Sequence, residues 1–243
     1  MTEQRRAVTA AIALGGALAA VLAGFGAGGV VPAAGATTTV ADWEMNESSG
    51  ATVMTDSSGH GITGAIGSKV TTGITYSGAK GFRFSYAKPN TPPAQPDKLV
   101  VVPDNDLLDP GTSDFVITIR YRTTHGFGNV VQKGQATSGG GQWKLQAPNG
   151  ILQCVWTGSL RKAAQGSPKA LDDGQWHTVV CENTGSKIGM SVDGGSMRWV
   201  AKTTGSIANT KPVTIGGKKD CDQVNVTCDY FAGDIDYIRI QKG

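Results

Sequence analysis

The spacing of short apolar runs between turn-forming residues is the feature that most limits what this chain can fold into. From residue 37 onward, no segment keeps the spacing of apolar residues that an amphipathic helix needs. Short runs rich in Val, Ile, Tyr, Phe and Trp instead alternate with clusters of Gly, Asn, Asp and Ser, and 35 glycines can supply tight turns. This pattern predicts an all-β fold, built as a sandwich of antiparallel sheets.

The predicted strands follow from alternation and from turn signals. From Phe115 to Tyr121, apolar residues alternate with more polar ones, which places one face of the strand against a core. Asp193-Gly194 and Asn149-Gly150 predict tight hairpin turns, because these dipeptides accept positive φ angles. The predicted strands are 98–102, 115–121, 129–133, 143–147, 151–156, 176–181, 187–192, 213–215 and 230–240.

Residues 1–36 have the composition of a secretory signal peptide. Arg5 and Arg6 precede an uncharged run, 7–31, and small residues end the segment at Ala36. A basic start, an apolar stretch and small residues at the cleavage point are typical of such a peptide. We therefore expect a secreted domain over residues 37–243, extracellular or at the cell surface, that does not span a membrane. Retention of the apolar run as a membrane anchor stays open, because it is long enough to cross a bilayer.

The charges of the chain are nearly balanced. The formal net charge is +3, and no block of like charge follows residue 36. Binding to nucleic acid needs a clustered basic face. We therefore expect no nucleic-acid partner.

The four cysteines predict two disulfides, since an even number is expected in an oxidising compartment. We expect Cys154 to pair with Cys181, because each lies in a predicted strand. Cys221 and Cys228 flank a short polar loop and would close it. The spacing lacks the Cys-x-x-Cys pattern of a zinc site. Closure of the longer loop should stabilise the fold by about 3 kcal/mol.

Four segments follow one another in a specific order along the chain. They are Trp43–Gly50 (WEMNESSG), Asp56–Gly61 (DSSGHG), Asp173–Val179 (DGQWHTV) and Phe231–Ile240 (FAGDIDYIRI). In this order they resemble the laminin G-like branch of the concanavalin A-like lectin/glucanase superfamily. The resemblance implies a jelly-roll sandwich of two antiparallel sheets, in which the first and last strands are adjacent.

The superfamily includes glycosidases and polysaccharide lyases, so the sequence was compared with their motifs. A retaining glycosidase needs two carboxylates about 5–5.5 Å apart, and the Glu-x-Asp-x-x-Glu strand of the glucanase branch does not occur here. Arg120, Tyr121 and Arg122 resemble part of a lyase site but lack its Gln-x-His strand. We interpret His177, which lies in the third segment, as a structural residue. These observations predict a non-catalytic module, with a polysaccharide-active enzyme of atypical site as the last alternative.

Asp56 and Asp236 are the predicted metal ligands. Alternation would place Asp236 on the same strand face as Ile238 and Ile240, where a carboxylate needs a partner. In related folds the equivalent acid helps to hold a structural calcium near the first strand. Asp56, with Asp42 as a further candidate, would supply more oxygen ligands. A salt bridge from Asp236, for instance to Arg239 or Lys69, and an Asx turn at Asp56 are the open alternatives.

The tryptophans outside the four segments are the predicted ligand contacts, because sugar rings stack on such faces. They are Trp143, Trp156 and Trp199, and Arg161 follows Trp156 in a polar loop that could add hydrogen bonds. The sequence therefore predicts a secreted module that binds carbohydrate, either a polysaccharide or a glycosylated surface. An extracellular module that binds protein is the alternative.

Overall fold

A computed structural model describes residues 37–88, 94–221 and 228–243. The chain divides into two units, Met1–Ala34 and Gly35–Gly243, and every described residue belongs to the second. The predicted signal peptide, residues 1–36, lies outside the described residues and stays a prediction. No helix in the described part combines the length and the apolar character that a membrane crossing requires.

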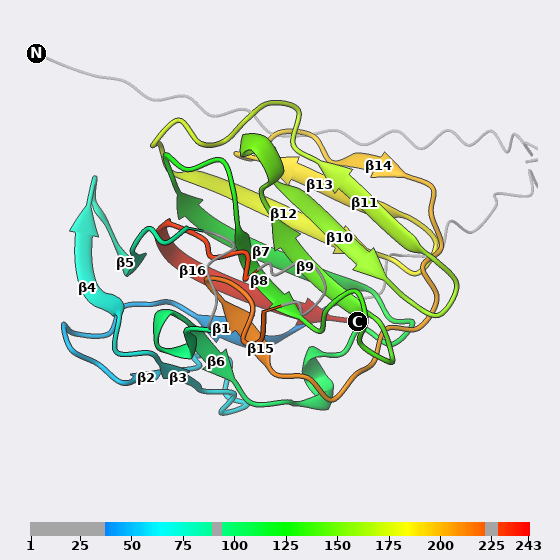
Figure 1. Ribbon diagram of the computed structural model, residues 1–243. Coiled ribbons are helices and arrows are strands. Elements are labelled where there is room, and N and C mark those ends of the chain that lie inside the picture. Colours follow the sequence, from blue (N-terminus) through cyan, green and yellow to red (C-terminus); the bar gives the residue numbers. More distant parts are fainter. Residues whose placement is uncertain (1–36, 89–93, 222–227) are drawn as a thin grey trace, which may run out of the picture. The chain divides into compact units, whose positions relative to one another are not determined.

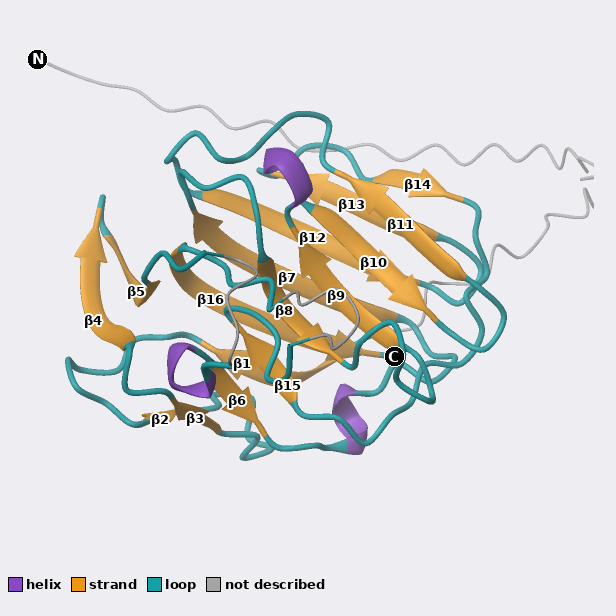
Figure 2. Ribbon diagram, in the orientation of Figure 1, coloured by secondary structure: helices purple, strands orange, loops and turns teal. Residues whose placement is uncertain are grey.

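Two antiparallel eight-stranded sheets form the sandwich (Figure 1), and the only helical elements described are three short 3-10 turns (Figure 2). We name the sheets A and B. Sheet A contains, in spatial order, β14 (Arg198–Val200), β13 (Ile188–Val192), β12 (His177–Asn183), β7 (Phe115–Arg122), β16 (Gly233–Lys242), β5 (Ala79–Phe84) and β4 (Val70–Tyr76), with β1 (Thr38–Trp43) also paired to β16. Sheet B contains β11 (Lys162–Gly166), β10 (Gln153–Thr157), β9 (Gln142–Gln146), β8 (Asn129–Lys133), β15 (Val213–Ile215), β6 (Val100–Val102), β3 (Gly64–Ile66) and β2 (Val53–Met54). The 3-10 turns are η1 (Pro96–Lys98), η2 (Asp106–Leu108) and η3 (Pro148–Gly150).

The first and last strands are adjacent, as the resemblance predicts. β1 runs antiparallel to the second half of β16, with Thr38 opposite Lys242 and Trp43 opposite Ile238. β5 pairs with the first three residues of β16 on the same side. The other side of β16 pairs with β7. The last strand therefore lies inside sheet A and joins both ends of the domain.

The core lies between the sheets and is built from alternate residues of each strand. In β7, Phe115, Ile117, Ile119 and Tyr121 are fully buried, and the residues between them are only partly covered. This confirms the alternation predicted for the segment. Burial of each large apolar side chain contributes about 1.5–3 kcal/mol, so such strands carry much of the stability of the sandwich.

Both predicted disulfides are confirmed. Cys154 lies in β10 of sheet B and Cys181 in β12 of sheet A, so this bridge joins the two sheets through the core, with a Cα–Cα distance of 5.8 Å. Cys221 and Cys228 close a loop with a sequence separation of 7. The two cysteine-bearing strands of the first bridge thus face each other across the sandwich.

A β-bulge in β16 changes the faces that its sequence predicts. The pairing with β7 shifts register between Ile235 and Tyr237. Ile235, Ile238 and Ile240 are all fully buried, whereas Asp236 is half-buried. The expectation that Asp236 shares a face with Ile238 and Ile240 is therefore wrong, because the extra residue of the bulge turns its carboxylate away from the core.

Candidate functional site

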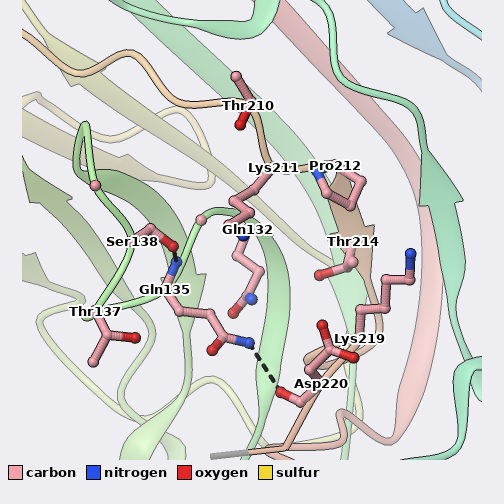
Figure 3. Close-up of a pocket in the computed structure, with 12 residues that line it drawn as sticks. Gln132, Gln135, Thr137, Ser138, Thr210, Lys211, Pro212, Thr214, Lys219 and Asp220 are labelled. Carbon is pink, nitrogen blue, oxygen red and sulfur yellow. Dashed lines mark hydrogen bonds between the residues drawn. The ribbon is translucent and has the colours of Figure 1, made fainter.

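A polar hollow of about 420 Å³ lies on the outer face of sheet B, above β8 and β15 (Figure 3). Gln132 and Thr214 point to this face, because their strand neighbours Val131 and Val213 point into the core. The loop from Gly134 to Gly139 and the segments beside β15 form the walls. The lining residues are Gln132, Gly134, Gln135, Thr137, Ser138, Gly139, Thr210, Lys211, Pro212, Thr214, Lys219 and Asp220.

A buried chain of polar side chains fixes the orientation of Gln132 at the floor of the hollow. Asn129 Nδ2 donates to Gln132 Oε1 at 2.7 Å and to Asp229 Oδ2 at 3.3 Å. Asp229 in turn pairs with the buried Lys218 at 2.8 Å. Asn129 therefore holds the carbonyl oxygen of Gln132, whose side chain lines the hollow. Such support holds a side chain in place before a ligand arrives.

The wall formed by residues 134–141 is held in shape by hydrogen bonds. Gln135 N donates to Ser138 Oγ at 2.8 Å, and Gln135 Nε2 donates to the backbone oxygen of Asp220 at 3.0 Å (Figure 3). Asn209 Nδ2 donates to the oxygen of Gly141 at 3.0 Å. Gly140 has a φ of +83° and lies against the backbone of Ala208, so only glycine fits there. The wall is therefore pre-formed.

Hydroxyl, amide and charged groups line the hollow, and its lining includes no aromatic ring. Lys211 and Lys219 are exposed and form no ion pair with any residue that the structure describes, whereas Asp220 adds one negative charge. Thr137, Thr210 and Thr214 add hydroxyl groups. Hydrogen-bond donors and acceptors that are spread over the hollow suit a ligand with many hydroxyl groups. On binding, such a ligand exchanges its hydrogen bonds to water for hydrogen bonds to the protein.

Two of the predicted ligand contacts are core residues. Trp143 and Trp156 are 0% and 1% exposed and pack near Phe115, with ring centroids 6.0 and 6.2 Å away. The indole N–H of Trp143 donates to the backbone oxygen of Leu108 at 2.9 Å. Their alternation in β9 and β10 turns both rings between the sheets, so neither face can stack on a sugar. The prediction that Trp143 and Trp156 contact a ligand is therefore wrong, because both side chains are buried in the core.

The other two predicted contacts lie at the surface but apart from each other. Trp199 lies in β14 at the edge of sheet A and is 40% exposed. One ring edge lies over Gly189, and Lys187 Nζ lies 3.9 Å from the ring centroid, so these neighbours cover the ring in part. Arg161 is exposed in the turn between β10 and β11 of sheet B. The structure does not bring the four predicted ligand residues together.

The carboxylate of Asp56 is hydrogen-bonded mainly to backbone N–H groups. Asp56 Oδ1 accepts from the backbone N–H groups of Asp42 and Ser58, and Oδ2 accepts from the N–H of Ile62 and the hydroxyl of Ser58, all at 2.8–2.9 Å. The bond to Ser58 forms an Asx turn, which was one of the alternatives. Burial alone would raise the pKa of Asp56, but these donors together outweigh it and lower the pKa below its ordinary value of 3.8.

Asp236 has a different partner, Arg120, at 2.5 Å. The alternative of a salt bridge at Asp236 is therefore confirmed, but its partner is Arg120 and not Arg239 or Lys69. Asp42 pairs with Arg239 at 2.8 Å. The described residues contain no group of three or more His, Cys, Asp or Glu side chains placed to hold a metal ion. Asp56 and Asp236 do not fit a shared calcium site in this arrangement, and calcium binding stays an untested prediction.

His177 has a structural place at the start of β12. Its ring is buried, with Nδ1 2.8 Å from Asp193 Oδ2 and Nε2 2.9 Å from Asp173 Oδ1. The backbone N–H of Gln175, followed by the His177 ring, lowers the pKa of Asp173. Both ring nitrogens are thus engaged with carboxylates that close the neighbouring turns.

Sequence reasoning missed the hollow, although one signal was present. Residues 134–141 are rich in Gly, Ser and Thr between two strands, which is typical of a surface loop that can carry a binding site. The opposite wall comes from residues 210–220, far along the chain. Only the pairing of β8 with β15 brings the two walls together.

The family model described as Laminin G domain matches residues 122–243 of the chain. This chain belongs to the laminin G domain family. No curated protein sequence matches it. The matched half of this laminin G domain begins in β7 and includes both disulfides, the hollow and the whole of β16.

Three solved structures show the same fold at low sequence identity. The binding domain of Paraclostridial Mosquitocidal Protein 1 is 14% identical, with a TM-score of 0.59, over 84% of this chain and 48% of that chain. The binding domain of Botulinum Neurotoxin DC in complex with SialylT is 14% identical, with a TM-score of 0.58, over 84% and 47%. Domain 4 of AbnA, an extracellular arabinanase from Geobacillus stearothermophilus, in complex with arabinotriose, is 14% identical, with a TM-score of 0.57, over 85% and 93%. The laminin G domain thus spans about half of each toxin chain and nearly all of the arabinanase domain.

Proposed function

We propose that this laminin G domain is a non-catalytic, extracellular module that binds a polysaccharide or a glycosylated surface through the hollow on sheet B. The observation that carries the proposal is the side chain of Gln132, which Asn129 holds by its carbonyl oxygen and which lines a polar hollow. A saccharide hydroxyl that accepts from the Gln132 amide would meet a donor already in place.

The comparisons support a saccharide as the ligand class. The arabinanase domain that matches over nearly its whole length was solved with arabinotriose, and one toxin binding domain was solved with SialylT. Two disulfides also suit an oxidising, extracellular environment. Because the hollow has no ring for stacking, we expect recognition by hydrogen bonds.

The first test measures binding of neutral saccharides, starting with arabinotriose and arabinan, to residues 37–243 by titration calorimetry. We expect Gln132→Ala to weaken binding about tenfold, since it removes a fixed donor and leaves its partner groups unpaired. Gln153→Ala is the matched control, because Gln153 lies on the same face of sheet B but does not line the hollow. Its affinity should equal that of the unchanged protein.

Two outcomes would contradict this proposal. One is the absence of binding across neutral oligosaccharides and polysaccharides. The other is a Gln132→Ala variant that keeps the melting temperature and the full affinity of the parent. Either result would favour a protein partner, for which pull-down with the same two variants is the next measurement.

A further inference from the structure

A second hollow, of about 220 Å³, lies on sheet A between the ends of β5, β7 and β16. Its base is an ion triad in which Arg83 and Arg122 both bind Asp234. Arg83 Nε and Nη2 donate to the carboxylate at 2.7 and 3.0 Å, and Arg122 Nε donates at 2.8 Å. Asp234 is 2% exposed in its side chain, whereas Arg83 is 45% exposed.

The triad leaves a positive charge facing the hollow. Two guanidinium groups share one carboxylate, and the other lining residues that the structure describes carry no acidic group. The bonds to Asp234 use Nε and Nη2 of Arg83, so Nη1 keeps its donors. The Asp234 hydrogen bond also raises the pKa of Arg83, which keeps the group charged. A guanidinium held in this way is pre-oriented for a second carboxylate.

Exposed aromatic rings flank these arginines. Tyr86 is 58% exposed and stacks on the exposed His125, with ring centroids 4.8 Å apart and an interplanar angle of 23°. Arg122 Cζ lies 3.5 Å from the ring centroid of Tyr76, which is 41% exposed. Ser85 and Thr124 add hydroxyl groups to the lining. The face thus combines a cation, ring surfaces and short polar groups.

We propose that this hollow binds the carboxylate of an acidic sugar, a uronic acid residue, with Arg83 binding the carboxylate and Tyr86 packing against the sugar ring. The site is separate from the hollow on sheet B and differs from it in charge and in its aromatic rings. An acidic polysaccharide would therefore be recognised on sheet A even if neutral saccharides are not bound on sheet B.

The test uses oligogalacturonate, together with its methyl ester as a ligand of the same backbone without charge. We expect oligogalacturonate to bind, the methyl ester to bind at least tenfold more weakly, and added salt to weaken only the charged ligand. Arg83→Gln should lower affinity about tenfold, which is the size expected for one charged hydrogen-bonding group. Lys80→Gln is the matched control, because it removes one positive charge from an exposed position of the same strand, β5, outside the hollow.

Tyr86→Ala provides a second variant if loss of Arg83 disturbs the buried Asp234, since Tyr86 is largely exposed. We expect it to lower affinity about fivefold. Equal binding of acid and ester, no binding of oligogalacturonate, or unchanged affinity of Tyr86→Ala would each overturn the proposal. Gln132→Ala tests neutral-saccharide binding on sheet B, whereas Arg83→Gln and Tyr86→Ala test oligogalacturonate binding on sheet A, so failure of one site and failure of the other give different results.

Discussion

Asp56 shows what a single carboxylate can do when most of its partners are backbone N–H groups. Its bonds connect the end of β1, through Asp42, to the loop that ends at Ile62. A charged acceptor holds such donors more strongly than a neutral one. Its lowered pKa therefore implies that ionised Asp56 stabilises the folded state.

At the residue scale, Asp56→Asn should destabilise the domain by about 1–2 kcal/mol at pH 7. The pKa of Asp56 is lower in the folded state, so its contribution is present above the ordinary value of 3.8 and is lost as pH falls through the lowered folded value. Urea unfolding at pH 7 and pH 3 should show the difference between variant and parent shrink at the lower pH.

Asp97→Asn is the control for this measurement, because the side chain of Asp97 forms an exposed salt bridge with Lys69. It should change stability by less than about 1 kcal/mol at both pH values. A difference for Asp56→Asn that is the same at pH 7 and pH 3 would contradict the argument. So would a loss of stability on calcium chelation that disappears in the variant, which would return Asp56 to a metal-binding role.

The roles of single residues were only partly predictable. The cysteine pairs followed from their positions in the sequence, and His177 was recognised as structural. Residue type alone does not separate Trp156, which is buried, from Trp199, which is 40% exposed. Their burial depends on which strand face meets the opposite sheet, and this is a property of the pairing rather than of the residue.

At the scale of elements, local pattern predicted strands well where turns bound them. β8 and β15 have the predicted limits, and η3 places Asn149 and Gly150 at φ values of +52° and +77°. The predicted strands do not include β1 to β5, β11 or β14. Of these, β5 and β11 are rich in Gly, Lys and Ala, which are depleted in strands, so their strand signal is weak. The bulge in β16 shifts the alternation between Ile235 and Ile238, but Tyr237 next to Ile238 hides this shift in the sequence, because apolar residues then occupy both faces of the strand.

The hairpin from β13 to β14 gives a test at this scale. Asp193 and Gly194 have φ values of +52° and +71°, and Gly195 N closes the turn on Val192 O at 2.9 Å. Gly194→Ala should cost about 1 kcal/mol, because an alanine in this conformation is strained although space around it is open. Gly139→Ala is the control, since it also enters open space but has no positive φ. Equal stability of the two variants in chemical unfolding would contradict this reading of the turn.

At the scale of the whole domain, the two disulfides should differ in their effect on stability. The bridge between Cys154 and Cys181 has a sequence separation of 27 and ties sheet A to sheet B, whereas the second bridge has a separation of 7. A longer closed loop restricts the unfolded chain more, by about 3 kcal/mol for the first bridge. The double Ser variant of Cys154 and Cys181 should lower the melting temperature by roughly 6–12 °C.

The double Ser variant of Cys221 and Cys228 is the matched comparison in the same calorimetric scan. We expect a smaller decrease, because fewer residues are enclosed. An equal or larger decrease for this variant would mean that strain or contacts, rather than loop closure, determine how these bridges act.

Thr38 in the first strand pairs with Lys242 in the last strand, so the two ends of the described domain are neighbours in sheet A. Because the first and last strands already lie side by side, a short peptide can join them without moving either one. New ends can then be opened at an exposed turn such as Asp193-Gly194, which gives a circular permutant with every strand pair intact. The same adjacency would let the domain be inserted into a loop of a host protein, with both junctions at the same end of two neighbouring strands, β1 and β16.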